Sequence, residues 1–319
     1  MDEFELIRRF FLPQERGKGV TLGIGDDGAV VVPVHGRSLV AVVDTLIEGV
    51  HYPLGFPASD VGFRALAVNL SDIAAMGGMP RWMTLALTLV DADESWLTGF
   101  AAGLFEAAAE YDVTLIGGDT TRGAQTVISV QLLGDVAPDA ILTRAGAKPG
   151  DGIYITGTVG DAAGGLALLK ASSGGDLDSD GEYLVRRFSR PAARVACGAS
   201  IAGRATAAID LSDGLGTDCL KLLRASDMAG TIDLGLLPVS VQLHRKFGHD
   251  RALQFALDGG DDYELCFTAG PADDSWLQDL AASEGLSIAR IGEVRQGAGL
   301  NCIRDGKTEP YVDRGYSHF

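Results

Sequence analysis

Apolar and polar residues follow one another along this chain in blocks that predict strands and helices in turn. Two runs rich in β-branched residues, 29–34 and 39–44, flank His35-Gly36-Arg37 and predict a β-hairpin. The other predicted strands are apolar runs bounded by glycine or polar residues, at 82–90, 113–116, 125–136, 153–156, 207–211, 265–268, 286–292 and 299–303. The predicted helices have apolar residues at helical spacing and cover 3–11, with an end near Pro13, 59–76, 94–111, 161–170, 191–204 and 216–225. Residues 173–182 are acidic and rich in glycine, so we expect a solvated loop there.

The length of the chain and this mixture of strands and helices predict two domains of the α/β (α+β) class. A chain of 319 residues is too long for one ordinary core. The segment 144–152 is small, polar and rich in turn-forming residues. We therefore expect an N-terminal domain over residues 1–145 and a C-terminal α/β domain over residues 146–319.

Charge and composition exclude several classes of function. A formal net charge of −17, without a stripe of Lys and Arg, argues against a nucleic-acid partner. No apolar run reaches the roughly 18 residues that a membrane-spanning helix needs, and the acidic start does not resemble a signal peptide. The four cysteines are widely spaced, which predicts buried thiols rather than a disulfide framework or a zinc site: Cys197, Cys219, Cys266 and Cys302. We expect a cytoplasmic protein.

Candidate chemistry lies in acidic residues beside glycines. The clusters are Asp26 with Asp27, Asp44, Asp72, Asp119, Asp210 with Asp213, and Asp261 with Asp262 and Glu264. Asp44 and Asp119 are expected at strand ends, and Asp72 is expected in the last turn of a helix, where an acid opposes the helix dipole. Ser212 is expected to cap the helix that follows it, leaving free amides for an anion.

These clusters predict an enzyme that binds Mg²⁺ on a phosphate chain. An isolated Asp-Asp-Gly is more often a hairpin turn, but here the pattern recurs. Carboxylates gathered at one edge repel one another unless cations hold them, and carboxylate oxygens are ligands that Mg²⁺ prefers. A conventional Walker A motif is absent, because Gly306-Lys307-Thr308 has Asn301 where the first glycine belongs.

At these motifs the chain resembles the thiamine-monophosphate kinase family. The segments that carry the resemblance are Gly23–Asp27, Asp44–His51, Asn69–Gly78, Gly117–Thr120, Asp210–Leu215 and Gly260–Leu265, and the similarity continues to Tyr316–Phe319. One departure is Asp261, where the usual residue of the family is Glu. The resemblance implies a two-domain aminoimidazole-ribotide synthetase-like fold, in which the N-terminal β-sheet forms a barrel across a homodimer. It also implies Mg²⁺-dependent transfer of the γ-phosphoryl group of ATP to thiamine monophosphate, giving thiamine diphosphate.

The resemblance further implies roles for individual residues. Several Mg²⁺ ions would be bound by Asp27, Asp44, Asp72, Asp119, Asp210 and Asp213. The nucleotide would contact Gly118, Asp119, Arg144 and Ser212, and the thiamine substrate would contact His51, Asp261 and Tyr316. Asp26 is expected to cap its turn while Asp27 binds metal, and simpler interpretations are a surface histidine for His51 and a core-closing aromatic for Tyr316. No catalytic side chain is expected, because an ionised acceptor phosphate needs positioning and charge neutralisation rather than a general base.

Two alternatives remain open at this point. Another ATP-using enzyme of the same superfamily is possible, but a hydrogenase-maturation enzyme needs a C-terminal cysteine, whereas this chain ends in His318-Phe319. A selenium-phosphate enzyme needs a reactive Cys or selenocysteine near the N-terminus, and the first cysteine here is Cys197. The alternative from a different class is a non-enzymatic acidic protein that binds divalent metal ions.

Overall fold

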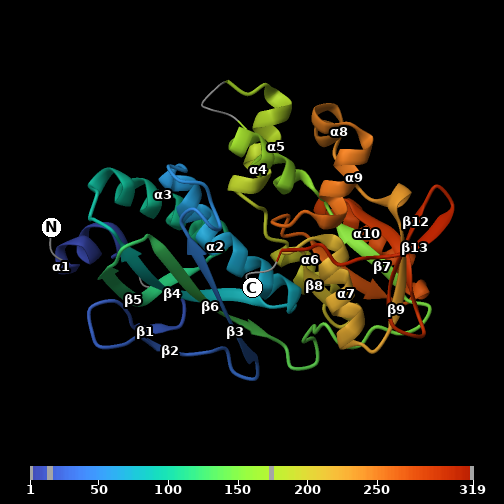
Figure 1. Ribbon diagram of the computed structural model, residues 1–319. Coiled ribbons are helices and arrows are strands. Elements are labelled where there is room, and N and C mark those ends of the chain that lie inside the picture. Colours follow the sequence, from blue (N-terminus) through green and yellow to red (C-terminus); the bar gives the residue numbers. More distant parts are fainter. Residues whose placement is uncertain (1–2, 13–16, 172–175, 317–319) are drawn as a thin grey trace. The chain divides into compact units, whose positions relative to one another are not determined.

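The computed structural model describes residues 3–12, 17–171 and 176–316, and the chain separates into two compact units (Figure 1). The first unit comprises Met1–Ile73 and Gly78–Pro138, and the second comprises Ala74–Gly77 and Asp139–Phe319. Three predictions fall partly outside the described residues: the helix end near Pro13, the first part of the loop 173–182, and the closing residues 317–319.

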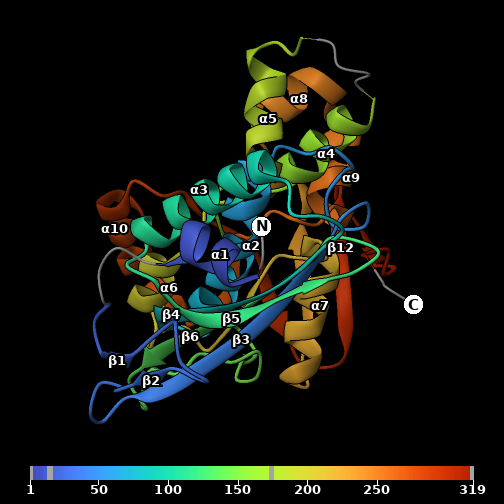
Figure 2. The same ribbon diagram turned by 90° about the vertical axis from the view of Figure 1, so that its left-hand side faces the viewer.

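The first unit is a four-stranded sheet with two long helices. Its elements are α1 (Glu3–Leu6), the π-helix η1 (Ile7–Phe11), β1 (Val20–Leu22), β2 (Val30–Val31), β3 (Ser38–Ile47), α2 (Ala58–Ala75), β4 (Met79–Leu89), α3 (Glu94–Glu110), β5 (Thr114–Arg122) and β6 (Val127–Val136). The strand order is β3-β6-β4-β5, antiparallel except for the parallel pair β4–β5. Both views show α2 and α3 on the same side of these strands (Figures 1 and 2).

Local sequence explains how the two long helices begin and end. Asp93 precedes α3, and its carboxylate accepts the backbone N–H groups of Ser95 and Trp96, which would otherwise lack partners. At the end of α2, Gly77 has a φ of +70°, a conformation that favours glycine. Gly78 N–H then donates to Ile73 O at 2.9 Å. The predicted helices 59–76 and 94–111 are confirmed.

The hairpin predicted from 29–34 and 39–44 is wrong. Strand β2 pairs with β1 in a separate two-stranded sheet, whereas β3 pairs along its whole length with β6. The turn at His35-Gly36-Arg37 does form, since Arg37 N–H donates to Val34 O at 3.2 Å. A local turn therefore did not decide which strands pair, because β6 offers β3 a ten-residue ladder and β2 does not.

The second unit is a seven-stranded sheet with helices around it. Its elements are β7 (Gly152–Thr156), α4 (Asp161–Ala171), α5 (Ser179–Ser189), α6 (Val195–Ile201), β8 (Ala207–Asp210), α7 (Leu215–Ala225), β9 (Ala229–Asp233), the 3₁₀ helix η2 (Leu234–Leu236), α8 (Val241–Phe247), α9 (His249–Asp258), β10 (Leu265–Ala269), the 3₁₀ helix η3 (Pro271–Asp273), α10 (Asp274–Glu284), β11 (Ile288–Arg295), β12 (Gly299–Arg304) and β13 (Lys307–Pro310). The strand order is β13-β12-β9-β11-β7-β10-β8, in which only β12–β9 is parallel. Both views show α4, α5, α8 and α9 together at one end of this unit (Figures 1 and 2).

The main core of the second unit is formed by its sheet together with α7 and α9. Every residue of β7, β8 and β10 is buried, which matches their continuous apolar sequences. The four cysteines are unpaired and buried, as predicted. None of the helices in the described part of the chain combines the length and the hydrophobicity needed to cross a membrane.

Several helices in this unit differ from the predictions. The predicted helix 191–204 is shorter, since α6 covers Val195–Ile201. The predicted loop 173–182 already contains the start of α5, because Asp178 caps that helix by accepting the N–H of Gly181 at 2.9 Å. Strand β9 and helices α8, α9 and α10 were not predicted.

Candidate active site

The predicted metal-binding acids Asp44 and Asp119 lie within strands rather than at their ends. Asp44 is in the second half of β3, and Asp119 is in the second half of β5. The prediction that both residues lie at strand ends is therefore wrong. Strand β5 continues past Gly117 and Gly118, because its pairing with β4 extends as far as the pair formed by Leu89 and Arg122.

The register of the sheet places these two acids on different faces. One row across the four strands joins Asp44, Val130, Leu85 and Gly118, and the next row joins Thr45, Ser129, Ala86 and Asp119. Paired residues share a face and successive residues alternate, and the two rows differ in burial: Leu85 and Val130 of the first row are buried, whereas Thr45, Ala86 and Asp119 of the second are exposed. Three strand spacings separate β3 from β5, a span of roughly 14 Å. One ion cannot contact both side chains within one copy of the chain.

The other predicted residues of the first unit lie on separate elements. Asp26 and Asp27 are exposed in the segment between β1 and β2, and Asp26 Oδ1 accepts the backbone N–H of Asp27 at 2.9 Å. Asp72 is half-buried in the last turn of α2, as predicted. His51 follows β3, and its Nδ1 accepts the N–H of Ile47 at 3.0 Å.

Gly118 has a packing role that the sequence did not reveal. A Cβ atom at this position would lie 1.9 Å from the carbonyl oxygen of Leu85 on β4. Only glycine therefore permits this approach of β5 to β4. At the neighbouring Gly117, by contrast, nothing lies within 4 Å of the place that a Cβ atom would occupy.

In the second unit, the structure brings several predicted residues together around the start of α7. Asp210 is buried and is the last residue of β8, as predicted. The predicted Ser212 cap is wrong: Gly214 precedes the helix and no side chain caps it. Arg144 is exposed but lies at the other end of α7, since its carbonyl oxygen accepts the hydroxyl of Ser226, the residue that follows the helix, at 3.0 Å.

Asp218 lies beside these residues, although no sequence motif pointed to it. Its carboxylate accepts the N–H groups of Ser212 at 3.0 Å and Asp213 at 2.9 Å, so these amides bind a side chain of the same chain. Lys221 donates to Asp218 Oδ1 at 2.8 Å and also to Asp213. Burial raises the pKa of Asp218, while these bonds oppose the rise. An acid in the first turn of an apolar helix was the available signal.

The predicted substrate residues Asp261 and Tyr316 lie beside the same loop. Asp261 N–H donates to Ser212 O at 2.9 Å, and Tyr316 N–H donates to Asp213 O at 3.4 Å. Tyr263 N–H donates to Leu211 O at 2.9 Å, which extends the pairing of β10 with β8. Tyr316 is 51% exposed, so the side chain does not close the core.

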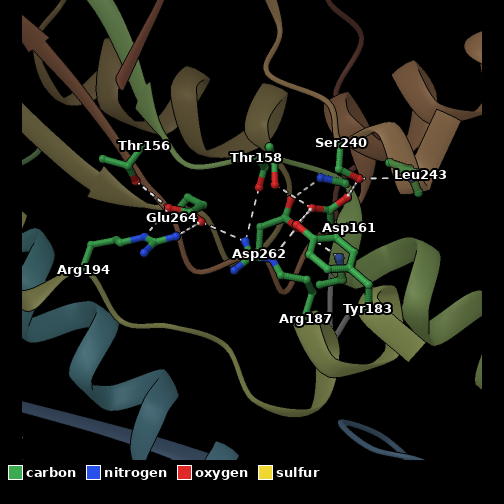
Figure 3. A network of polar contacts seen from close by, with 12 residues as sticks. Thr156, Thr158, Asp161, Tyr183, Arg187, Arg194, Ser240, Leu243, Asp262 and Glu264 are labelled. Atoms are coloured by element: carbon green, nitrogen blue, oxygen red, sulfur yellow. Dashed lines mark hydrogen bonds and ion pairs between the residues drawn. The ribbon is translucent and has the colours of Figure 1, made fainter. Parts of the chain in front are cut away.

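The other two acids of this motif, Asp262 and Glu264, point into the protein instead (Figure 3). Asp262 accepts the N–H groups of Gly160 at 2.6 Å and Ala162 at 3.2 Å, at the start of α4. Burial raises the pKa of Asp262 to about 8. Glu264 is fully buried against two arginines and a threonine hydroxyl.

The described residues contain no group of three His, Cys, Asp or Glu side chains placed to hold a metal ion. Mg²⁺ in kinase sites commonly takes one or two carboxylates and completes its shell with substrate phosphates and water. The predicted donors are all carboxylates, and several are exposed or half-buried in their own units. This donor set fits Mg²⁺ bound in that way.

Comparisons with known proteins identify the family. Residues 25–136 match the family described as AIR synthase related protein, N-terminal domain, and residues 148–305 match AIR synthase related protein, C-terminal domain. The chain is 44% identical over 319 residues to the thiamine-monophosphate kinase of Escherichia coli strain K12, covering 99% of this chain and 98% of that protein.

Solved structures agree with this relationship. The crystal structure of thiamine-monophosphate kinase from Stenotrophomonas maltophilia K279a has a TM-score of 0.87 at 43% identity and covers 95% of each chain. A structure described as AaThiL complexed with AMPPCP and TMP has a TM-score of 0.81 at 30% identity, covering 99% of this chain and 96% of that one. The expected two-domain fold is confirmed. The chain belongs to the AIR synthase related family and, within it, to the thiamine-monophosphate kinases.

Proposed function

We propose that this protein is a kinase that transfers the γ-phosphoryl group of ATP to thiamine monophosphate, giving thiamine diphosphate. The observation that carries the proposal is membership of the thiamine-monophosphate kinases over the whole length of the chain. The related AaThiL structure is described as complexed with AMPPCP, an ATP analogue, and TMP, which we take to be thiamine monophosphate. We further propose that the protein acts in the cytoplasm.

We propose that Mg²⁺ takes part and is held by the carboxylates of Asp27, Asp44, Asp72, Asp119, Asp210 and Asp213. The wide separation of Asp44 and Asp119 in one sheet supports more than one ion. Bound Mg²⁺ would neutralise the negative charge on the two phosphate groups that must approach each other. Lys221 already pairs with Asp213, so this carboxylate would exchange or share that partner on binding metal.

The remaining site residues would bind and orient the two substrates. Gly118, Asp119, Arg144 and Ser212 are proposed to contact ATP, and His51, Asp261 and Tyr316 to contact thiamine monophosphate. Arg144 and Tyr316 are exposed, which supports contact with a ligand. Positioning of this kind can lower the barrier substantially, since the reacting groups are already held together. No general base is needed, because the acceptor oxygen is already ionised. We propose residues 1–145 as the domain for ATP, Mg²⁺ and dimerisation, and residues 146–319 as the C-terminal domain.

The proposed reaction is tested by incubating the purified protein with Mg²⁺, ATP and thiamine monophosphate, and identifying the product by mass spectrometry. Asp44→Asn and Asp119→Asn should abolish turnover without unfolding the protein, because Asn keeps the size and shape of the side chain while removing the negative charge proposed to bind Mg²⁺. The matched control is Asp91→Asn, an exposed acid outside the motifs, which should keep full activity. Near-normal activity of both site variants at limiting Mg²⁺ would contradict the metal assignment.

We propose direct in-line transfer without a phosphorylated enzyme. The carboxylates of the site are assigned to Mg²⁺, which leaves them poorly placed to attack phosphorus. Incubation with γ-labelled ATP and Mg²⁺, without thiamine monophosphate, should leave no label on the protein. A stoichiometric phosphoenzyme that reacts with thiamine monophosphate would rule this pathway out.

We propose a homodimer formed by the sheet of the first unit, as expected for the dimer barrel. Strand β3 is an edge strand with apolar side chains at the surface, since Val43 is 62% exposed and Leu39 is 50% exposed. A long apolar edge of this kind is usually covered by a partner. Val43→Asp should weaken the dimer, while Val312→Asp, at an equally exposed valine of the second unit, should not. Sedimentation showing a wild-type monomer at micromolar concentration would refute the dimer.

A further inference from the structure

The segment that carries Asp261 has a strained backbone. Asp261 has a φ of +71° and Tyr263 a φ of +52°, a region that residues with a side chain seldom occupy. Such residues keep this conformation only where the surrounding structure fixes it. Backbone bonds to Leu211 and Ser212 fix one side of the segment.

The other side of the segment is fixed by buried charge. Glu264 Oε1 accepts from Arg187 at 2.8 Å, and the same carboxylate accepts two bonds from Arg194, at 2.5 and 2.6 Å. Thr156 donates to Glu264 Oε2 at 2.7 Å and accepts the N–H of Leu265 at 2.8 Å. The residue at the end of the strained segment therefore has its side chain and its neighbouring amide both held.

Arg187 connects this carboxylate to the helices around it (Figure 3). It reaches from α5, where its side chain is only 14% exposed, and also donates to Thr158 O at 3.3 Å. Its Nε lies 3.8 Å from Asp161 Oδ2, and Asp262 is a further acidic neighbour. Arg187 thus lies among the buried carboxyl groups of Asp161, Asp262 and Glu264. Asp262 belongs to the strained segment, and Glu264 follows it directly.

We propose that Arg187 is a positioning residue that fixes the backbone carrying Asp261, and so controls binding of thiamine monophosphate. The proposal rests on the proposed function, in which Asp261 contacts that substrate. Without Arg187, Glu264 keeps Arg194 and Thr156 but loses its link to α5 and Thr158. Asp262 loses its neighbouring cation. The strained segment then relaxes, and Asp261 leaves the position it needs.

The test compares Arg187→Met with Arg187→Lys, which keeps a cation, in the full-length protein. The matched control is Arg186→Met, which removes an exposed arginine from the same helix. Arg187→Met should raise KM for thiamine monophosphate by about tenfold, with KM for ATP changed less than about twofold, since only one substrate segment moves. Arg187→Lys should give an intermediate KM, and Arg186→Met a wild-type KM.

A double-mutant cycle with Asp261→Ala separates positioning from a general loss of structure. If Arg187 acts through Asp261, replacing it in the Asp261→Ala background should raise KM for thiamine monophosphate no further. If Arg187→Met does not fold, Arg187→Lys carries the same cycle. The proposal is overturned if replacing Arg187 raises KM equally in the wild-type and Asp261→Ala backgrounds, or if neither Arg187→Met nor Arg187→Lys raises KM. In both cases the wild-type enzyme is still active. A wild-type protein that forms no thiamine diphosphate overturns the proposed function itself, and this proposal with it.

Discussion

Gly118→Ala is expected to destabilise the first unit even when no nucleotide is present. The added Cβ would lie 1.9 Å from Leu85 O and 2.8 Å from the Leu85 carbonyl carbon. Relieving this overlap requires the backbones of β4 and β5 to separate locally by about 1 Å, and overpacking of this kind costs about 1–3 kcal/mol. A weakened ladder hydrogen bond adds about 1 kcal/mol. We therefore expect the free energy of unfolding to fall by about 2–4 kcal/mol.

Gly117→Ala supplies the matched control. Nothing lies within 4 Å of a Cβ atom at Gly117, and its φ is not positive. Replacing a glycine by alanine at such a position stabilises a protein by about 0.4–1 kcal/mol, because the unfolded chain has fewer conformations. The two neighbouring substitutions should therefore change stability in opposite directions.

The assay is urea unfolding of both variants and the wild type without ATP, so that a lost ligand contact cannot contribute to the difference. Equal midpoints for Gly118→Ala and Gly117→Ala would refute the reasoning, because they would mean that β5 does not pass close to Leu85. If the variants differ as expected, loss of activity in Gly118→Ala will not by itself identify Gly118 as an ATP contact.

Three further predictions concern the pKa of a buried acid, the C-terminal segment and the metal. Burial raises the pKa of Asp262 to about 8, so the folded state binds this proton more tightly than the unfolded chain, and the stability that the proton contributes is lost as pH rises from about 4 to about 8. As pH rises through that range, Asp262→Asn should therefore become more stable relative to the wild type. Urea midpoints of variant and wild type that change with pH by the same amount would contradict this. Thr217 donates to Asp313 Oδ1 at 2.6 Å, a bond that holds the segment before Tyr316 and lowers the pKa of Asp313. Thr217→Val should raise KM for thiamine monophosphate roughly fivefold, as expected for a net loss of about 1 kcal/mol, whereas Thr217→Ser should not; equal KM values would count against the contact. Removing divalent ions with EDTA should stop thiamine diphosphate formation and added Mg²⁺ should restore it, while turnover in EDTA would exclude a metal requirement.

Much of the local structure could be read from the sequence. Helices α2 and α3 and strands β4 and β7 have the periodicity, caps and turn residues that specify an element by itself. Asp210 was placed correctly at the end of β8, because a short apolar run stops there. The motifs also indicated the family, since each carries its residue types at fixed spacing within one short segment.

Tertiary structure alone decided which elements pair and which way the acids point. Residues 29–44 looked like a hairpin, but β3 pairs with β6, whose residues lie far along the chain. That pairing sets the rows that place Asp44 and Asp119 on different faces, and a shift of one residue would exchange the faces. Within the Asp261–Glu264 motif, Asp261 is half-buried, whereas Asp262 and Glu264 are buried. The sequence alone does not distinguish these three carboxylic acids. Partners distant in sequence determine burial and pairing, so the local pattern could name these residues but could not assign them to the site or to the core.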